Sequence, residues 1–179
     1  MAELAKRQVW TGRGIYLALA ITIIFIQLLP LDQRPTLFSP PDFLLVLTLV
    51  WVARRPDFVP FYMIGTVFFL TDLLFQRPPG LMSALVLIAS EVIRSRAQSI
   101  RDLPFLGEFG LVAFAVIAVA AVNRATLAIV LTPQPYQLLE LLHILATLIA
   151  IPFVMFSAQF IFGVRRPAPG QVDSMGQRL

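Results

Sequence analysis

Five ionisable side chains lie within or beside strongly apolar stretches of this chain. They are Asp42, Asp72, Arg124, Glu140 and His143. Two such acids could form an aspartyl dyad, and a histidine among acids could ligate a metal. An ionisable group in an apolar segment of membrane length is costly to bury, so it usually has a partner, a ligand or water beside it. These residues are therefore the first candidates for a functional site.

The motifs that accompany enzymatic chemistry are missing from the sequence. Neither Asp42 nor Asp72 has the glycine-flanked context typical of intramembrane aspartyl proteases, and His143 is the only histidine in a chain without cysteine. The sequence also contains no G-x-x-x-x-G-K-[ST] loop, no H-E-x-x-H zinc motif and no G-x-S-x-G nucleophile elbow. We expect no enzymatic activity, no metal and no cofactor.

The composition indicates an integral membrane protein. Of the 179 residues, 58% are hydrophobic and 13% are charged, whereas charged residues make up about 25% of a soluble domain. The net charge is +4, but the basic residues mark the ends of apolar runs and form no patch typical of a soluble nucleic-acid-binding surface. We therefore expect membrane lipid as a partner and no nucleic acid.

Apolar runs divide the chain into segments joined by short polar loops. Their ranges are 15–31, 43–53, 58–75, 81–93, 109–131 and 138–163. A perpendicular span needs about 20 residues, so the first, third, fifth and sixth runs are of membrane length, while the second and fourth are short. We expect an all-α integral membrane protein, a compact bundle of six transmembrane helices over 15–163. The N-terminal segment 1–14 and a disordered tail, 164–179, are then cytoplasmic.

The basic residues decide whether the two short runs cross the membrane. With Arg124 left out because it lies within the fifth run, six crossings and a cytoplasmic N-terminus place eleven Lys and Arg residues inside and two, Arg34 and Arg77, outside. Without the second crossing, the better orientation gives nine against four. The positive-inside rule favours six spans with both termini in the cytoplasm, although whether 43–53 spans fully stays open. Arginines of the cytoplasmic loops are expected to fix topology or contact anionic lipid head groups. These arginines are Arg54, Arg55, Arg94, Arg96 and Arg101.

Depth along the runs brings the candidate residues together. Asp72 lies about 14 residues from the inner end of its run, or roughly 21 Å at 1.5 Å per residue. Arg124 lies near the outer end of the fifth run, and Glu140 and His143 occupy the first two turns of the sixth. We expect Arg124 to pair with Glu140 or Asp72 and Asp42 to serve a helix N-terminus. The simpler alternatives are that Arg124 snorkels, Glu140 is interfacial and Asp72 is a solvated helix end.

Alanines recur at spacings of three and four in the last two runs. They are Ala118, Ala121, Ala125 and Ala128 in one run, and Ala146 and Ala150 in the other. Small residues on one face let helix backbones approach closely. We expect these faces to pack within the bundle, with a transmembrane helix of another protein as the alternative.

Two segments of the chain carry a family resemblance. The first is Pro41-Asp42-Phe43-Leu44-Leu45, which opens a short helix, and the second is Asp72-Leu73-Leu74 followed by Gly80-Leu81 and Ala84. Together they resemble the bacterial rod shape-determining MreD family. Arg-Arg-Pro-Asp at 54–57 and Phe-Gln-Arg-Pro-Pro-Gly at 75–80 resemble the alphaproteobacterial members. The similarity covers most of the chain in length, hydropathy and helix number.

The resemblance implies a non-enzymatic inner-membrane component of the cell-elongation (rod) complex, needed for rod shape and lateral peptidoglycan synthesis. It implies MreC as the main partner, with MreB, RodA and a penicillin-binding transpeptidase as further ones. The helix plan also resembles the substrate-binding subunits of energy-coupling-factor transporters, so the alternative is a substrate-binding membrane subunit of a vitamin-type transporter. The residues expected to form an outward-facing site for a partner or ligand are Asp42, Asp72, Gly80, Arg124, Glu140 and His143.

Overall fold

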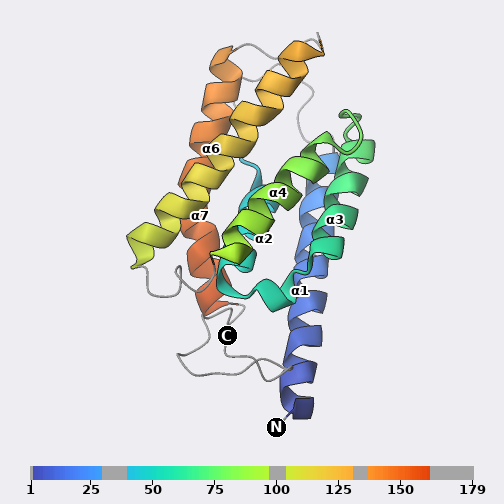
Figure 1. The fold of residues 1–179 in the computed structure, drawn as a ribbon, viewed down its shortest axis with the longest axis vertical. Coiled ribbons are helices and arrows are strands. Elements are labelled where there is room, and N and C mark those ends of the chain that lie inside the picture. Colours follow the sequence, from blue (N-terminus) through green and yellow to red (C-terminus); the bar gives the residue numbers. More distant parts are fainter. Residues whose placement is uncertain (1, 30–39, 97–103, 131–136, 162–179) are drawn as a thin grey trace.

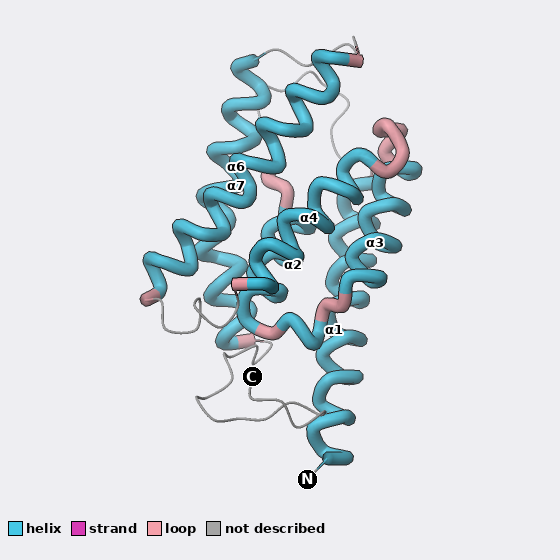
Figure 2. Tube along the Cα trace, viewed as in Figure 1, coloured by secondary structure: helices cyan, strands magenta, loops and turns pink. Residues whose placement is uncertain are grey.

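The computed structural model describes residues 2–29, 40–96, 104–130 and 137–161, and every regular element in this part is helical (Figure 2). The expected all-α class is therefore confirmed for the described residues. The elements are α1 (Ala2–Leu28), α2 (Phe43–Arg54), the short 3-10 helix η1 (Pro56–Phe58), α3 (Phe61–Leu74), α4 (Leu81–Ser95), α6 (Phe105–Ile129) and α7 (Gln137–Phe160). Arg101 and the tail 164–179 lie outside the described residues.

Successive helices run in alternating directions, as the colour sequence in Figure 1 shows. The helices α6 and α7 form an antiparallel pair on one side, α1 and α3 lie on the other, and α2 and α4 lie between them. The C-terminal ends of α2 and α4 therefore lie at the same end of the bundle as the N-terminal end of α1. We refer to this as the lower end, and to the end where α2, α4 and α7 begin as the upper end.

Within the described part of the chain, three helices are long and apolar enough to cross a bilayer. They are α1 over Lys6–Leu28, α6 and α7, whereas α2 and α3 are apolar but shorter. The prediction that run 58–75 is of membrane length is wrong, because η1 occupies its beginning and Pro60 precedes the first residue of α3. Proline is tolerated at the start of a helix, but it has no N–H to donate to the preceding turn, so a helix cannot continue unbroken through Pro60. The three long apolar helices nevertheless indicate a membrane protein.

The central element is α2, whose residues from Leu44 to Arg54 are all buried. It packs against α1, α4, α6 and α7, so it has no face left for lipid or water. Its one hydroxyl is satisfied, because Thr48 donates to the Leu44 carbonyl at 2.7 Å and lies 2.9 Å from the Tyr16 hydroxyl. A helix that is apolar on all sides is expected in such a position.

The contact between α1 and η1 depends on Gly12. A Cβ at this position would lie 2.5 Å from the Phe58 ring, so only glycine lets the two elements approach this closely. One residue later, Arg13 Nε donates to the Asp57 carbonyl at 3.2 Å. The lower half of α1 is thereby attached to the turn that follows α2.

The alanine face of α6 points away from the bundle. The buried residues of α6 are Glu108, Val112, Ala115, Val116 and Val119. Ala121, Ala125 and Ala128 are exposed and Ala118 is only partly buried, so the predicted packing role is wrong for this face. Valine side chains have more apolar area to bury than alanine side chains, and the face with Val112, Val116 and Val119 is the one that packs into the bundle. On α7, Ala150 is buried and Ala146 is partly buried.

Candidate functional site

A cavity of about 330 Å³ lies at the upper end of the bundle. Its walls come from the start of α2, the loop between α3 and α4, the start of α4, the second half of α6 and the first half of α7. This volume is in the range of small-molecule sites in proteins. The polar side chains that line it are Asp42, Arg77, Asn123, Arg124, Glu140, His143 and Thr147.

A chain of hydrogen bonds joins α2 and α7 on one side of the cavity. Asp42 Oδ1 accepts from the Leu45 N–H at 3.0 Å and so caps α2. The Asp42 N–H donates to Thr147 Oγ1 at 3.1 Å, and this hydroxyl donates to the His143 carbonyl at 2.7 Å. His143 Nδ1 lies 2.7 Å from the Pro40 carbonyl. Because a carbonyl only accepts, Nδ1 is the donor in this contact.

Arg124 and Glu140 form an ion pair across α6 and α7, one of the two pairings expected from the sequence. Both side chains are partly exposed, so they are neither fully desolvated nor free in solvent. Glu140 lies in the first turn of α7, where the positive end of the helix dipole also favours a carboxylate. The pair closes one wall of the cavity and ties the two helices together.

Reversal of either charge in this pair is expected to lower the free energy of unfolding by about 1–2 kcal/mol, between the values for exposed and buried pairs. The double variant Arg124→Glu/Glu140→Arg should recover part of that loss, and not all of it, because it places a cation at the start of α7. Unfolding in mixed micelles titrated with dodecyl sulfate measures each value. A double variant as unstable as the sum of the two single variants would contradict the pairing.

Asp72 does not line the cavity, contrary to expectation. Its side chain is 0% exposed, so it is not a solvated helix end either. Asp72 Oδ2 accepts from the N–H groups of Gly80 at 3.0 Å and Ser83 at 3.2 Å. Gly80 is the N-cap of α4 and has a φ of 85°, which glycine adopts without strain. Because a glycine cap has no side chain, the carboxylate of Asp72 replaces the missing acceptor. Gly80 and Asp72 therefore fix the start of α4.

Arg77, in the loop between α3 and α4, lines the cavity, whereas Asp72 does not. The Arg77 guanidinium lies 5.4 Å from the centre of the Phe75 ring, a cation–π contact that orients the side chain. The sequence indicated Arg77 only as an outer-loop charge, and it did not single out Asn123. Asn123 could have been noticed as a second polar residue beside Arg124 in an apolar run.

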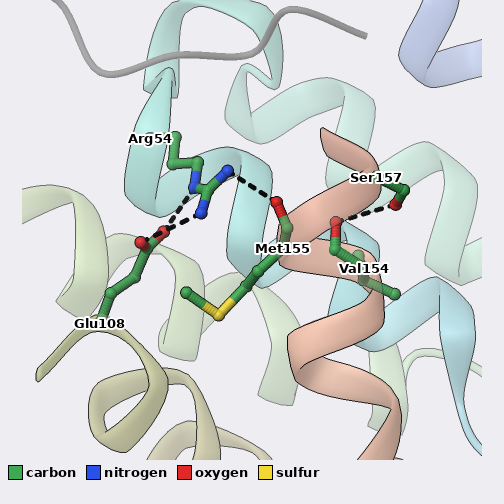
Figure 3. Close-up of polar contacts among 5 residues, drawn as sticks. All are labelled: Arg54, Glu108, Val154, Met155 and Ser157. Atoms are coloured by element: carbon green, nitrogen blue, oxygen red, sulfur yellow. Dashed lines mark hydrogen bonds and ion pairs between the residues drawn. The ribbon is translucent and has the colours of Figure 1, made fainter. Parts of the chain in front are cut away.

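A second polar cluster lies at the lower end, where the sequence did not predict one (Figure 3). Arg54 Nε donates to Glu108 Oε1 at 2.6 Å, Nη2 donates to Glu108 Oε2 at 3.2 Å, and Nη1 donates to the Met155 carbonyl at 2.9 Å. Arg54 is 5% exposed and Glu108 is 1% exposed. The prediction that Arg54 contacts lipid head groups is therefore wrong: its guanidinium joins α2, α6 and α7 inside the protein.

The predicted run 109–131 leaves Glu108 in the preceding loop. In the structure α6 begins at Phe105, so Glu108 lies within the helix. The signal for its burial was periodicity, because Glu108 is spaced like a core residue from Val112, Ala115 and Val116. A buried carboxylate requires a cation. Arg54 at the end of the wholly apolar α2 is the cation that the fold supplies.

The remaining lower-end arginines have mixed surroundings. Arg94 Nη2 donates to the Val59 carbonyl at 2.7 Å, and its Nε lies 3.5 Å from Glu91. The Arg55 guanidinium lies 4.6 Å from the centre of the Phe58 ring, and Arg96 is exposed. Contact with lipid head groups stays a prediction for these three residues.

The cavity is lined by both apolar and polar side chains, so it suits a molecule with both characters. Among the described residues, no three side chains of His, Asp or Glu lie close enough together to hold a metal ion. Comparison with models of protein families, with curated proteins and with solved structures finds no match for this chain.

Proposed function

We propose that the chain is a non-enzymatic component of the bacterial cell-elongation complex, of the MreD type, which scaffolds MreC and the associated wall synthases in the inner membrane. The observation that carries the proposal is the location of the two segments on which the resemblance rests. Asp42 from the first segment and Leu81 from the second line one cavity, and Arg77 and Pro78 of the stretch 75–80 line it as well. A site built from both segments is what a shared binding function would require.

The charge distribution supports a multi-pass topology with both termini in the cytoplasm. Basic residues gather at the lower end, on the first turns of α1 and the last turns of α2 and α4, whereas Arg77 and Arg124 lie at the upper end. The positive-inside rule then assigns the lower end to the cytoplasm. In this orientation the cavity faces the outer side of the membrane, where the periplasmic domain of MreC would lie.

Depletion of the protein in its source bacterium tests this function. Cells are expected to lose their rod form and become round, and expression of the intact chain should restore rods. In the same strain, MreC should co-purify with the tagged chain in mild detergent. If cells remain rods of normal width after complete depletion, the proposed function is contradicted.

The cavity itself favours a second candidate, a substrate-binding subunit of a vitamin-type transporter. Its volume of about 330 Å³ and its mixed polar and apolar lining suit a small molecule. Such a subunit would co-purify with a coupling ATPase and retain a water-soluble compound. Recovery of MreC without an ATPase would favour the scaffold.

A further inference from the structure

The polar groups of the cavity divide into those with partners and those without. Asp42 caps α2, and Glu140 pairs with Arg124. By contrast, the Arg77 guanidinium has no carboxylate partner within the described residues, and its one recorded contact is the Phe75 ring. The described residues also give no hydrogen bond to the Asn123 amide. The cavity therefore holds a cation and an amide donor that are available to a ligand.

The interior of the cavity is apolar below these groups. Val116 and Val119 of α6, Met82 of α4 and Ile144 of α7 form its walls. Along α6, Val116 lies seven residues below Asn123, or about 10 Å at 1.5 Å per residue. On the α6 wall, Asn123 thus lies toward the helix terminus and hydrocarbon side chains line the part deeper in the bundle. On the opposite walls, Asp42 and Thr147 also line the cavity, and they are bonded to each other.

We propose that this cavity binds a phosphate-bearing lipid, with the phosphate against Arg77 and Asn123 and one hydrocarbon chain along Val116 and Val119. Arg77 is an exposed cation at the cavity without a carboxylate partner among the described residues, so it is available to an anion, and the planar guanidinium matches phosphate through two parallel hydrogen bonds. The apolar walls require a chain that a soluble anion lacks. This inference rests on the proposed function in one respect: the proposed topology turns the cavity to the outer side of the membrane, so the lipid head group would lie at that membrane surface.

The ligand can be tested on the purified full chain, stripped of lipid in detergent, by native mass spectrometry. The probes are phosphatidylglycerol, a polyprenyl phosphate, the matching polyprenol without phosphate, and inorganic phosphate. We expect one phosphate lipid to bind per chain, at least about tenfold more tightly than polyprenol, because a charge-assisted hydrogen bond contributes that much. The tighter of the two phosphate lipids identifies the source of the ligand. Equal affinity for polyprenol, or displacement of bound lipid by an equal concentration of inorganic phosphate, would overturn the proposal.

A matched pair of substitutions on α6 tests the apolar part. Ala120 lines the cavity, whereas Ala121 is exposed on the other side of the same turn. Ala120→Phe should fill the cavity and weaken binding at least about tenfold, since the chain and the new ring cannot occupy the same space. Ala121→Phe should leave the affinity within about twofold. Equal retention of lipid by the two variants would mean that the lipid coats the protein surface, and this would overturn the proposal.

A second pair tests the head-group contact and does not disturb the core. Arg77→Gln removes the cation at the cavity, and Arg96→Gln removes an exposed arginine at the opposite end of α4. The first change should weaken binding of the phosphate lipid about tenfold and leave polyprenol binding unchanged, whereas the second should change neither. Equal effects of the two changes would overturn the head-group assignment. These assays do not depend on cell shape, so the two proposals can fail separately. If depleted cells become round but the chain binds no phosphate lipid, only the lipid proposal is contradicted. If the chain binds the lipid but depleted cells stay rod-shaped, only the proposed function is contradicted.

Discussion

Glu108→Gln is expected to lower the free energy of unfolding by about 3–5 kcal/mol, the loss typical of breaking one side of a buried ion pair. The reason is the 5% exposure of Arg54: once the carboxylate is gone, its charge has neither a counter-ion nor water. The Met155 carbonyl remains as an acceptor at 2.9 Å, but a neutral carbonyl does not balance the charge. Unfolding in mixed micelles titrated with dodecyl sulfate gives the value.

Two comparisons separate this effect from a general loss of charge. Glu91 pairs with Arg94 on the surface of α4 at 3.5 Å, so Glu91→Gln should cost less than about 1 kcal/mol. The double variant Arg54→Met/Glu108→Leu should be close to the original chain in stability, because apolar residues of similar volume replace a desolvated pair well. A loss for Glu108→Gln no larger than that for Glu91→Gln would mean that the pair is solvated.

Asp72→Ala is expected to lower the free energy of unfolding by about 1–3 kcal/mol, because two N–H groups at the start of α4 lose their acceptor. Asp72→Asn keeps one oxygen and should recover part of this loss. Hydrogen exchange should quicken at the amides of Gly80 and Ser83, the two groups that Asp72 Oδ2 binds. Stability and exchange together report on the cap.

Asp57 provides the control for this change. It is a partly buried acid in η1, and the recorded bond to it uses its backbone carbonyl, so Asp57→Ala should change stability by less than about 0.5 kcal/mol. Equal losses for Asp72→Ala and Asp57→Ala would mean that the bonds to Gly80 and Ser83 contribute nothing. Exchange rates at Gly80 that stay unchanged would lead to the same conclusion.

Local patterns were sufficient to locate the helices approximately, but not their bounds, and to predict one side of the cavity. Apolar runs gave the positions of the helices because each must bury or embed its side chains over its whole length. Asp42 could be recognised as a cap from its position before α2, and Arg124 and Glu140 could be paired because short connections place consecutive antiparallel helices side by side. These inferences need distances along the chain and little knowledge of how the helices are rotated.

The errors arose where rotation and long-range packing decide the outcome. The alanines of α6 share a face, but the pattern does not say whether valines on another face will be buried instead. Asp72 lies at the upper end of the bundle, and its acceptor role depends on the loop conformation that brings Gly80 and Ser83 back to it. Arg54 and Glu108 are separated by 54 residues, and only the assembled bundle brings them together.

The burial of α2 has a consequence for how the protein is made. With 12 residues, α2 is about 18 Å long at 1.5 Å per residue, well short of a hydrocarbon core of about 30 Å. Its C-terminal Arg54 is neutralised by Glu108 of α6 and bonded to Met155 of α7, and both helices leave the ribosome later. Segments that emerge after α2 therefore complete its environment, because its buried surface includes contacts with α6 and α7.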